Sequence, residues 1–158
     1  MLQFNHKGFL TPNGIITSDL FELKSNFVDG ILSETRKELF EQYLFYSESL
    51  KHGCGYSYLQ WINGSYCTRK KEPADIDLVS FIPYTLIDAN EKLFKQFSHP
   101  NSEIEYGVDA YIVRVYPENS RLYPQYISDR LYWLAKFSRT KLNRAGNRDS
   151  KGFLEIIF

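Results

Sequence analysis

The spacing of the apolar residues changes at Gly53 and Gly55, and this change constrains the fold more than any other feature of the sequence. Before the two glycines, leucines and aromatic residues recur at helical spacing in a segment that begins at Ser33. After them, aromatic and apolar runs bounded by glycine and proline are typical of strands, with helical segments between them. The sequence therefore predicts one α+β domain, in which a small mixed sheet is flanked by helices and preceded by a helical segment over residues 1–55.

Two helices are expected before Gly53. Asp19 and Glu22 have the spacing of a capping box, and Ser33 has a side chain suited to the start of a longer helix. Beyond Gly55 the apolar patterns predict strands over 56–62, 75–82, 107–115 and 152–158, and helices over 86–97 and 126–137.

The composition is that of a chain that can bury a core. Of the 158 residues, 43% are hydrophobic and 16% are aromatic, which argues against a disordered chain. The first residues are too polar for a secretory signal, and no apolar run approaches the ~18 residues of a membrane span. We therefore expect a cytoplasmic protein that does not bind a membrane. Nineteen basic residues balance nineteen acidic ones, so the net charge gives no sign of a polyanionic partner.

Gly64 and Ser65 follow the strand expected over 56–62. A strand that runs into Gly–Ser and then into a helix or loop makes a phosphate-binding turn. Glycine lets the backbone approach the anion closely, and the exposed amides that follow point at it. The Ser65 hydroxyl adds a further donor. Taken alone, however, Gly–Ser is more often an ordinary turn.

Asp75 and Asp77 lie in the next expected strand, whose other residues are mostly apolar. Residues two apart in a strand project from the same face, so the two carboxylates are expected to point together. Aspartate is rare in strands, and neighbouring like charges are unfavourable without a counter-ion. Mg²⁺ resolves this conflict, because it takes oxygen ligands and bridges carboxylates to substrate phosphates. The alternative is an edge strand whose acids are solvated.

Asp109 supplies a third acid, in the strand expected over 107–115. Three converging carboxylates can hold two metal ions, one on a triphosphate and one that activates an attacking hydroxyl. Asp109 would also act as the general base that takes the proton of that hydroxyl. The alternative is a strand-start aspartate bonded to a nearby amide.

The order of these residues resembles that of the polymerase-beta-type nucleotidyltransferase superfamily. The pattern of that superfamily is a hydrophobic strand, Gly–Ser, a spacer, and Asp–hydrophobic–Asp. The resemblance implies that Gly64 and Ser65 bind the phosphates of a nucleoside triphosphate, and that Asp75 and Asp77 bind the metal. The third acid of the superfamily falls on Asp109.

The chain as a whole resembles a less-described bacterial group of minimal nucleotidyltransferases in the same superfamily. The shared segments are GFLTP near the start, NGSYCTRK around Gly–Ser, and KGFLEI near the end. The resemblance implies a polymerase-beta-like fold with its catalytic core at 56–118 and a C-terminal helix and strand at 119–158. It implies no particular substrate.

Basic residues gather towards the C-terminal end of the chain. From Arg130 to Lys151 there are seven lysines or arginines and one acid, Asp149. Arg148 and Lys151 are the residues expected to contact a triphosphate, together with Lys70 after the Gly–Ser turn. Aromatic residues interleaved with basic ones are also typical of an RNA-binding surface. The favoured alternative is an amphipathic helix with aromatic residues in the core and a solvated basic face.

The expected function is the transfer of a nucleoside monophosphate from a nucleoside triphosphate to an acceptor hydroxyl, with Mg²⁺ or Mn²⁺ as the metal. ATP is the expected nucleotide, and the acceptor is a protein, an RNA or a small molecule. Some small members of the superfamily are antitoxins that nucleotidylate a toxin, so the partner expected by analogy is a toxin or a phage-defence effector. Two alternatives stay open: a non-catalytic module of the same fold that binds a protein partner, and an RNA-binding protein.

Overall fold

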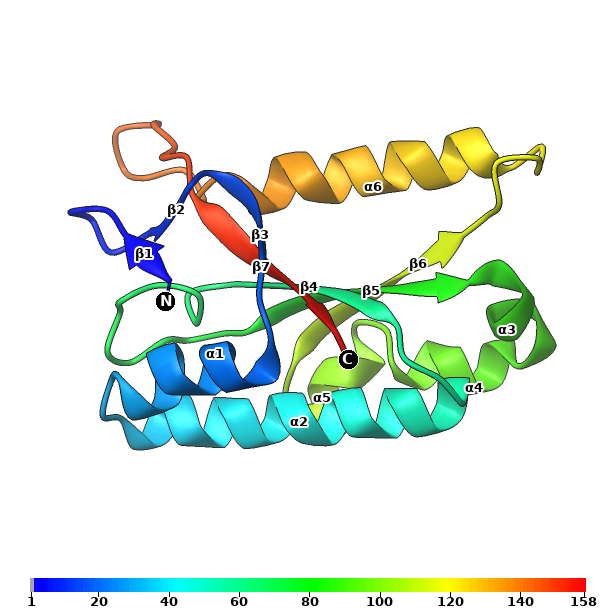
Figure 1. Cartoon of the computed structure of the whole chain (residues 1–158), viewed down its shortest axis with the longest axis horizontal. Helices are drawn as coiled ribbons and strands as arrows, with labels where there is room; N and C mark the ends of the chain where they lie inside the picture. The colour runs from blue at the N-terminus through cyan, green and yellow to red at the C-terminus, as the bar shows by residue number, and fades with distance from the viewer. Residues whose placement is uncertain (1) are drawn as a thin grey trace.

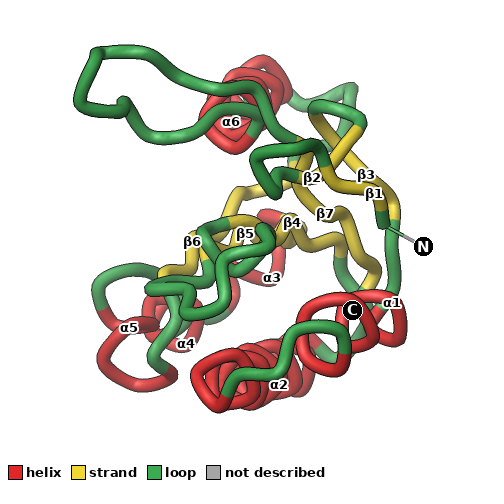
Figure 2. Tube along the Cα trace, turned by 90° about the vertical axis from the view of Figure 1, so that its left-hand side faces the viewer, coloured by secondary structure: helices red, strands yellow, loops and turns green. Residues whose placement is uncertain are grey.

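Five strands form one mixed sheet with helices on both faces in the computed structural model, which describes residues 2–158 (Figure 1). Across the sheet the order is β3 (Gly14–Thr17), β7 (Gly152–Ile157), β4 (Leu59–Asn63), β5 (Asp77–Pro83) and β6 (Asp109–Val115). One long helix, α6 (Tyr123–Phe137), lies over one face, and the helices between residues 20 and 106 lie on the other (Figure 2). The expected α+β class with a mixed sheet is therefore confirmed.

The directions of the strands bring three strand ends together. β4 runs antiparallel to both β5 and β7, whereas β5 and β6 are parallel to each other, as are β3 and β7. As a result, β4 ends at the same side of the sheet at which β5 and β6 begin. Residues at these three ends are neighbours although they lie far apart in the sequence.

The two helices expected before Gly53 both form, and each begins at the expected cap. Asp19 Oδ1 accepts a hydrogen bond from Glu22 N at 2.7 Å at the start of α1 (Leu20–Lys24), which continues into a π-helical turn, η1 (Ser25–Asp29). Ser33 Oγ accepts from Arg36 N at the start of α2 (Glu34–Cys54). Gly55 ends α2 with a φ of 78°, a left-handed conformation that glycine adopts without steric cost.

The single helix expected over 86–97 is wrong. Two short helices, α3 (Tyr84–Ala89) and α4 (Glu91–Gln96), meet at Asn90, whose φ and ψ of −151° and 62° are not helical. Asn90 Oδ1 caps α4 by accepting from Leu93 N, and such competition between side chain and backbone is the usual reason for which asparagine ends helices. A further helix, α5 (Asn101–Tyr106), was not expected, because this short and mostly polar segment has no apolar residues repeating at helical spacing.

The remaining differences are at element ends and in the segment before α1, which was expected to be helical but holds three strands, one of which, β3, joins the main sheet. α6 begins at Tyr123 rather than at 126, with a proline in its first turn, where a missing amide hydrogen costs no helical bond. A two-stranded ribbon of β1 (Gln3–Phe4) and β2 (Leu10–Thr11) precedes β3. No helix among residues 2–158 is long and apolar enough to cross a membrane.

The core has two parts, one on each face of the sheet. On the α6 face, Trp61, Val79 and Phe81 pack with Trp133 and Phe137 of α6. On the opposite face, alternate residues of the same strands pack against α2 and its neighbours. The central strands are thus buried on both faces, as is usual for strands covered by helices on both sides. Polar side chains that project between α6 and the sheet therefore require a specific partner.

Candidate functional site

Three polar residues from three adjacent strands stand side by side at one end of the sheet. Asn63 at the end of β4 pairs with Asp77 at the start of β5, and Asp77 pairs with Asp109 at the start of β6. Asp77 shares its strand face with Val79 and Phe81, which contact α6, so the row lies on the α6 face. The structure therefore brings Asp77 and Asp109 together as the sequence predicted, and adds Asn63.

The turn after Asn63 requires glycine. Gly64 has a φ of +84°, and a Cβ on this residue would lie 2.8 Å from Asp75 O and 3.0 Å from Asp77 N. Real Cβ atoms essentially never show the first distance and rarely show the second, and both atoms belong to the backbone, so the turn passes the start of β5 too closely for a side chain. Gly64 therefore fixes the position of Ser65 relative to the two acids.

Ser65 and Asp75 hold this turn together. Asp75 Oδ1 accepts hydrogen bonds from Ser65 N at 2.8 Å and from Ser65 Oγ at 2.7 Å, and Ser65 Oγ accepts from Ala74 N. Asp75 Oδ2 lies 3.6 Å from Lys141 Nζ. Burial alone would raise the pKa of Asp75, but the two hydrogen bonds from Ser65 and the charge of Lys141 hold it below its usual value.

The strand expected over 75–82 is shorter than predicted. β5 begins at Asp77, so Asp75 lies before the strand and its carboxylate is directed by Ser65 rather than by the pleat of the sheet. The two acids still interact electrostatically. Burial, followed by the charges of Asp75 and Asp109, raises the pKa of Asp77 to about 6.

Asp109 lies beside aromatic side chains. His99 Nδ1 is 3.2 Å from Asp109 Oδ1, and the imidazole stacks on Tyr111 with ring centroids 5.7 Å apart. The contact with His99 lacks hydrogen-bond geometry, so Asp109 Oδ1 is left without a donor among residues 2–158. Burial and then the neighbouring Asp109 raise the pKa of Tyr111 to about 12, which keeps its hydroxyl protonated.

Of the three acids expected to bind a metal, Asp77 and Asp109 stand side by side in register, whereas Asp75 is hydrogen-bonded to Ser65. Among residues 2–158, no three His, Cys, Asp or Glu side chains are arranged so that they hold a metal ion. Asp75 is held by Ser65, which leaves Asp77 and Asp109 as neighbours across two strands. Two carboxylates fit Mg²⁺, because this ion usually takes one or two carboxylates and completes its shell with water and substrate phosphates.

One cavity of about 870 Å³ opens beside the row and is lined by almost all residues predicted for the site. They are Gly64, Ser65, Lys70, Asp75, Asp77, Arg148 and Lys151. Asp109 is the exception, since it adjoins Asp77 but is not part of the cavity wall. The volume lies within the range of about 300–1,000 Å³ that is typical of small-molecule sites.

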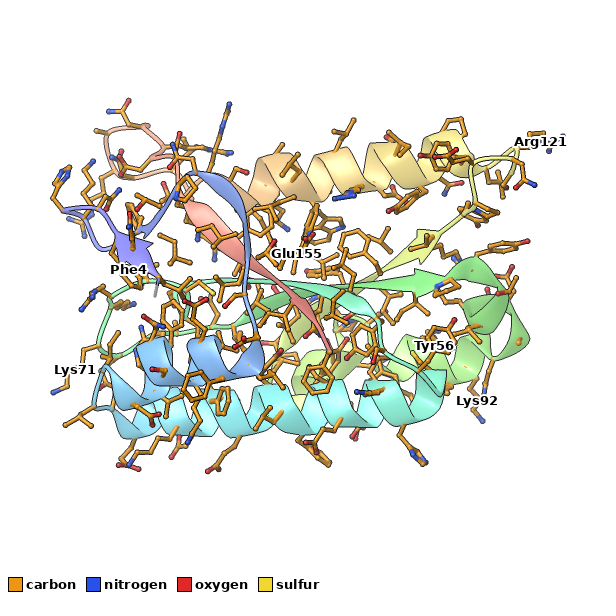
Figure 3. The ribbon with its side chains drawn as sticks, in the orientation of Figure 1. Phe4, Tyr56, Lys71, Lys92, Arg121 and Glu155 are labelled. Atoms are coloured by element: carbon orange, nitrogen blue, oxygen red, sulfur yellow. The ribbon has the colours of Figure 1, made fainter. Side chains whose placement is uncertain are left out.

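The N-terminal loop of residues 5–9 forms a part of the cavity wall that sequence reasoning missed. Phe9 forms an isolated bridge with Thr68, and Arg69 N donates to Gly8 O at 2.9 Å, so this loop is fixed to the segment that follows Ser65. The Arg69 guanidinium lies 4.6 Å from the ring centroid of Phe4, which Figure 3 marks in β1. No spacing in the sequence signals this contact.

The wall of the cavity is strongly basic. Eight lysines and arginines line it, against the carboxylates of Asp75 and Asp77: Lys7, Arg69, Lys70, Lys136, Arg139, Lys141, Arg148 and Lys151. Lys7 is paired with Asp149 at 2.6 Å, and Lys136 lies 4.5 Å from the Trp133 ring centroid. Such a wall favours a ligand with several negative charges.

Lys151 differs from the other cations because it is buried, with 7% of its surface exposed. Its Nζ donates a long hydrogen bond of 3.4 Å to Gly64 O. Burial lowers the pKa of Lys151, although Cys67, Asp77 and Asp75 act in the opposite direction. Lys151 therefore links the end of the chain to the Gly64 turn.

Residues 2–157 match the model of a protein family described as a family of unknown function (DUF6932), and the chain therefore belongs to that family. Searches of curated proteins and of solved structures give no match.

Proposed function

We propose that this protein is a metal-dependent nucleotidyltransferase that moves a nucleoside monophosphate from a nucleoside triphosphate to an acceptor hydroxyl and releases pyrophosphate. The observation that carries the proposal is the in-register pair of Asp77 and Asp109 beside the Gly64–Ser65 turn and a basic cavity. The resemblance to polymerase-beta-type nucleotidyltransferases rests on Gly64, Ser65, Asp75 and Asp77, with Asp109 as the third acid. We extend the proposal to the fold, in which the mixed sheet of β4, β5 and β6 corresponds to the nucleotidyltransferase core.

The Gly64–Ser65 turn and the cavity cations bind the triphosphate in this proposal. Gly64 keeps the backbone free of a side chain at the point of closest approach, and Ser65 offers a hydroxyl. Lys70 and Arg148 on the wall supply positive charge, and Lys151 stabilises the turn by donating a hydrogen bond to Gly64 O. Cations placed before the reaction stabilise the charge that builds on the transferred phosphate.

Asp77 and Asp109 would hold the metal, which would supply activation of the attacking hydroxyl and neutralisation of phosphate charge. Asp77 fits this role because it is partly buried, and no hydrogen bond or ion pair to its carboxylate is found among residues 2–158, so a bound cation would offset the burial of its charge. Asp109 takes the proton of the acceptor hydroxyl, since it adjoins Asp77 and has one oxygen without a donor. The acceptor then approaches from the side of His99 and Tyr111.

The acceptor is a protein, an RNA or a small molecule in this proposal, with a toxin or a defence effector as the protein partner by analogy. Binding of RNA without catalysis is a second candidate function. It is favoured by the excess of cations on the cavity wall, because a basic groove with neighbouring aromatic side chains is typical of single-stranded nucleic acid sites.

The test is calorimetric titration of each of the four nucleoside triphosphates with Mg²⁺ into the wild type and the Asp77→Asn/Asp109→Asn double variant. The isosteric substitutions keep the packing and leave Asp75 to hold the Ser65 turn. We expect magnesium-dependent binding that weakens by at least about tenfold in the double variant, or about 1.4 kcal/mol. Glu118→Gln, an exposed acid outside the cavity wall, is the matched control and should bind as the wild type does.

The nucleotide that binds is then used, radiolabelled, to find the acceptor in a cell extract. Transfer of label that requires both Asp77 and Asp109 supports the enzyme. Absence of binding for all four nucleotides, in a sample that is folded by circular dichroism, contradicts the proposed function. Tight binding of single-stranded RNA by such a sample would then favour the second candidate.

A further inference from the structure

The amide oxygen of Asn63 has no hydrogen-bond donor although the residue is buried. Asn63 is 4% exposed and lines the cavity. Its Nδ2 donates to Phe137 O at 3.4 Å, whereas its Oδ1 is shielded from solvent and accepts nothing from residues 2–158. Buried acceptors are nearly always paired, so this oxygen points to a species that the protein binds.

The orientation of the Asn63 amide follows from its neighbours. Exchange of the nitrogen and oxygen would place Oδ1 against Phe137 O, so that two acceptors faced each other. Asn63 Nδ2 therefore faces α6, and Asn63 Oδ1 is available to accept a bond from a ligand. Because the bond to Phe137 is long, a small rotation of the amide towards Asp77 breaks little.

The neighbours of Asn63 in the sheet are acceptors as well. Asp77 pairs with Asn63 in register, and Asp109 follows on the next strand with one oxygen that lacks a donor. In an antiparallel pair such as Asn63 and Asp77, side chains directly opposite each other have Cβ atoms about 4.5–5.5 Å apart. Three adjacent positions on one face thus carry side-chain oxygen atoms, of which Asn63 Oδ1 and Asp109 Oδ1 have no donor among residues 2–158.

Two lysines near the row have partners outside it. Lys151 Nζ donates to Gly64 O, and Lys141 Nζ lies by Asp75. His99 Nδ1 lies 3.2 Å from Asp109 Oδ1 but does not supply it with a hydrogen bond. Shielding of Asn63 Oδ1 also means that bulk water does not replace the missing donor. A cation bound at the row would satisfy all three positions at once.

We propose that Asn63, Asp77 and Asp109 form one divalent-metal site in which Asn63 Oδ1 is the neutral third ligand. Amide and carboxylate oxygens are the ligands that hard divalent cations take in proteins. The two carboxylates carry two negative charges and the amide carries none, so one divalent ion neutralises the row. An aspartate at position 63 would leave one negative charge in excess. Asp75 remains the residue that holds Ser65. This inference rests on the proposed function, because it adds a ligand to the same metal.

The experiment measures Mn²⁺ binding by electron paramagnetic resonance of the free ion, without nucleotide and then with the nucleotide that binds the wild type. Asn63→Leu removes the amide oxygen with little change of volume, and we expect it to weaken Mn²⁺ binding at least about tenfold, as loss of a metal-site partner does. Asn63→Asp keeps an oxygen there and is expected to bind Mn²⁺ as tightly as the wild type or more tightly.

The matched control is Gln60→Leu. Gln60 is a buried amide on the same strand, and it faces the opposite side of the sheet, where it bonds Ser80. This variant is expected to lose stability and to keep Mn²⁺ affinity, which separates an effect of the metal site from a general loss of packing. Thermal denaturation shows which variants are folded. If Asn63→Leu does not fold, Asn63→Asp is the test, and weaker Mn²⁺ binding by Asn63→Asp than by the wild type contradicts the inference.

The outcomes distinguish the two proposals. Mn²⁺ affinity that is unchanged in Asn63→Leu and lost in Asp77→Asn overturns the role of Asn63 and leaves the proposed function standing. A wild type that binds no Mn²⁺, with or without nucleotide, overturns both.

Discussion

Asp77 is the residue at which burial and charge oppose each other most directly. Its pKa is raised from 3.8 to about 6 by burial, then by Asp75 and Asp109. A carboxyl with a raised pKa binds its proton more tightly in the folded state than in the unfolded state. The stability that this provides is therefore complete below pH 3.8 and is lost as the pH rises through about 6.

We predict that Asp77→Asn stabilises the protein at pH 7.5 by about 1–2 kcal/mol when divalent metals are removed with EDTA, because the amide carries no charge to bury. The gain should shrink as the pH falls from 6 towards 4, where wild-type Asp77 is protonated. Urea denaturation across this pH range measures the effect. A gain that is constant with pH would mean that the charge of Asp77 is not its cause.

Single residues of the site could be predicted only where the signal is local. Gly64, Ser65, Asp75 and Asp77 lie close together in the sequence, and all four line one cavity. The role of Asp75 was not predictable, because its bonds to Ser65 depend on how the turn closes. The N-terminal loop of residues 5–9 was missed since its place in the wall depends on tertiary pairing.

The backbone of residues 66–70 follows the Gly64–Ser65 turn, and Arg36 of α2 fixes this backbone by hydrogen bonds. Arg36 of α2 is fully buried and donates to the carbonyl oxygens of Tyr66, Thr68 and Lys70 and, more weakly, of Phe27. No carboxylate pairs with Arg36 among residues 2–158. The guanidinium thus fixes the backbone that follows the Gly64–Ser65 turn.

We predict that Arg36→Leu destabilises the protein by about 3–5 kcal/mol, because several buried carbonyl oxygens lose a charged donor. The neighbouring substitution Lys37→Leu is the control, since Lys37 is exposed on the same helix and bonds only Glu34. Chemical denaturation of both variants measures the difference. Equal effects would show that Arg36 contributes only helix propensity.

Secondary-structure elements were predictable where capping chemistry is local. Asp19 and Ser33 mark the starts of α1 and α2 because each bonds an amide three residues on. The break at Asn90 was not visible, since asparagine is compatible with either a helix or its end. α5 depends on its contacts with α2 and β6 rather than on a period of its own, so sequence patterns could not show it.

Over the whole molecule, equal numbers of acidic and basic residues conceal an uneven distribution. The chain has nineteen of each, yet the cavity wall holds eight cations and two carboxylates. Lys92 and Arg121 lie at the end of the molecule opposite Phe4 and Lys71 (Figure 3). A polyanion is therefore expected to be attracted to the cavity wall despite the balanced charge of the whole chain.

We predict that Lys141→Gln/Arg148→Gln weakens binding of inorganic tripolyphosphate and lessens its dependence on salt, because fewer ion contacts remain to be screened. The expected loss is about tenfold at low salt, or roughly 1.4 kcal/mol. Lys92→Gln/Arg121→Gln removes the same charge away from the cavity and is the control. Titration calorimetry at two salt concentrations measures both, and an equal loss in the control would refute a local effect.

The parallel pairing of β7 with β3 has a consequence for the order of synthesis. β7 is the last strand to be made, yet it lies between β3 and β4 inside the sheet. Until residues 151–157 have left the ribosome, β4 lacks its neighbour β7 and the Gly64 turn lacks its bond from Lys151. The cavity therefore takes shape late in synthesis, after all the other strands of the sheet have been made.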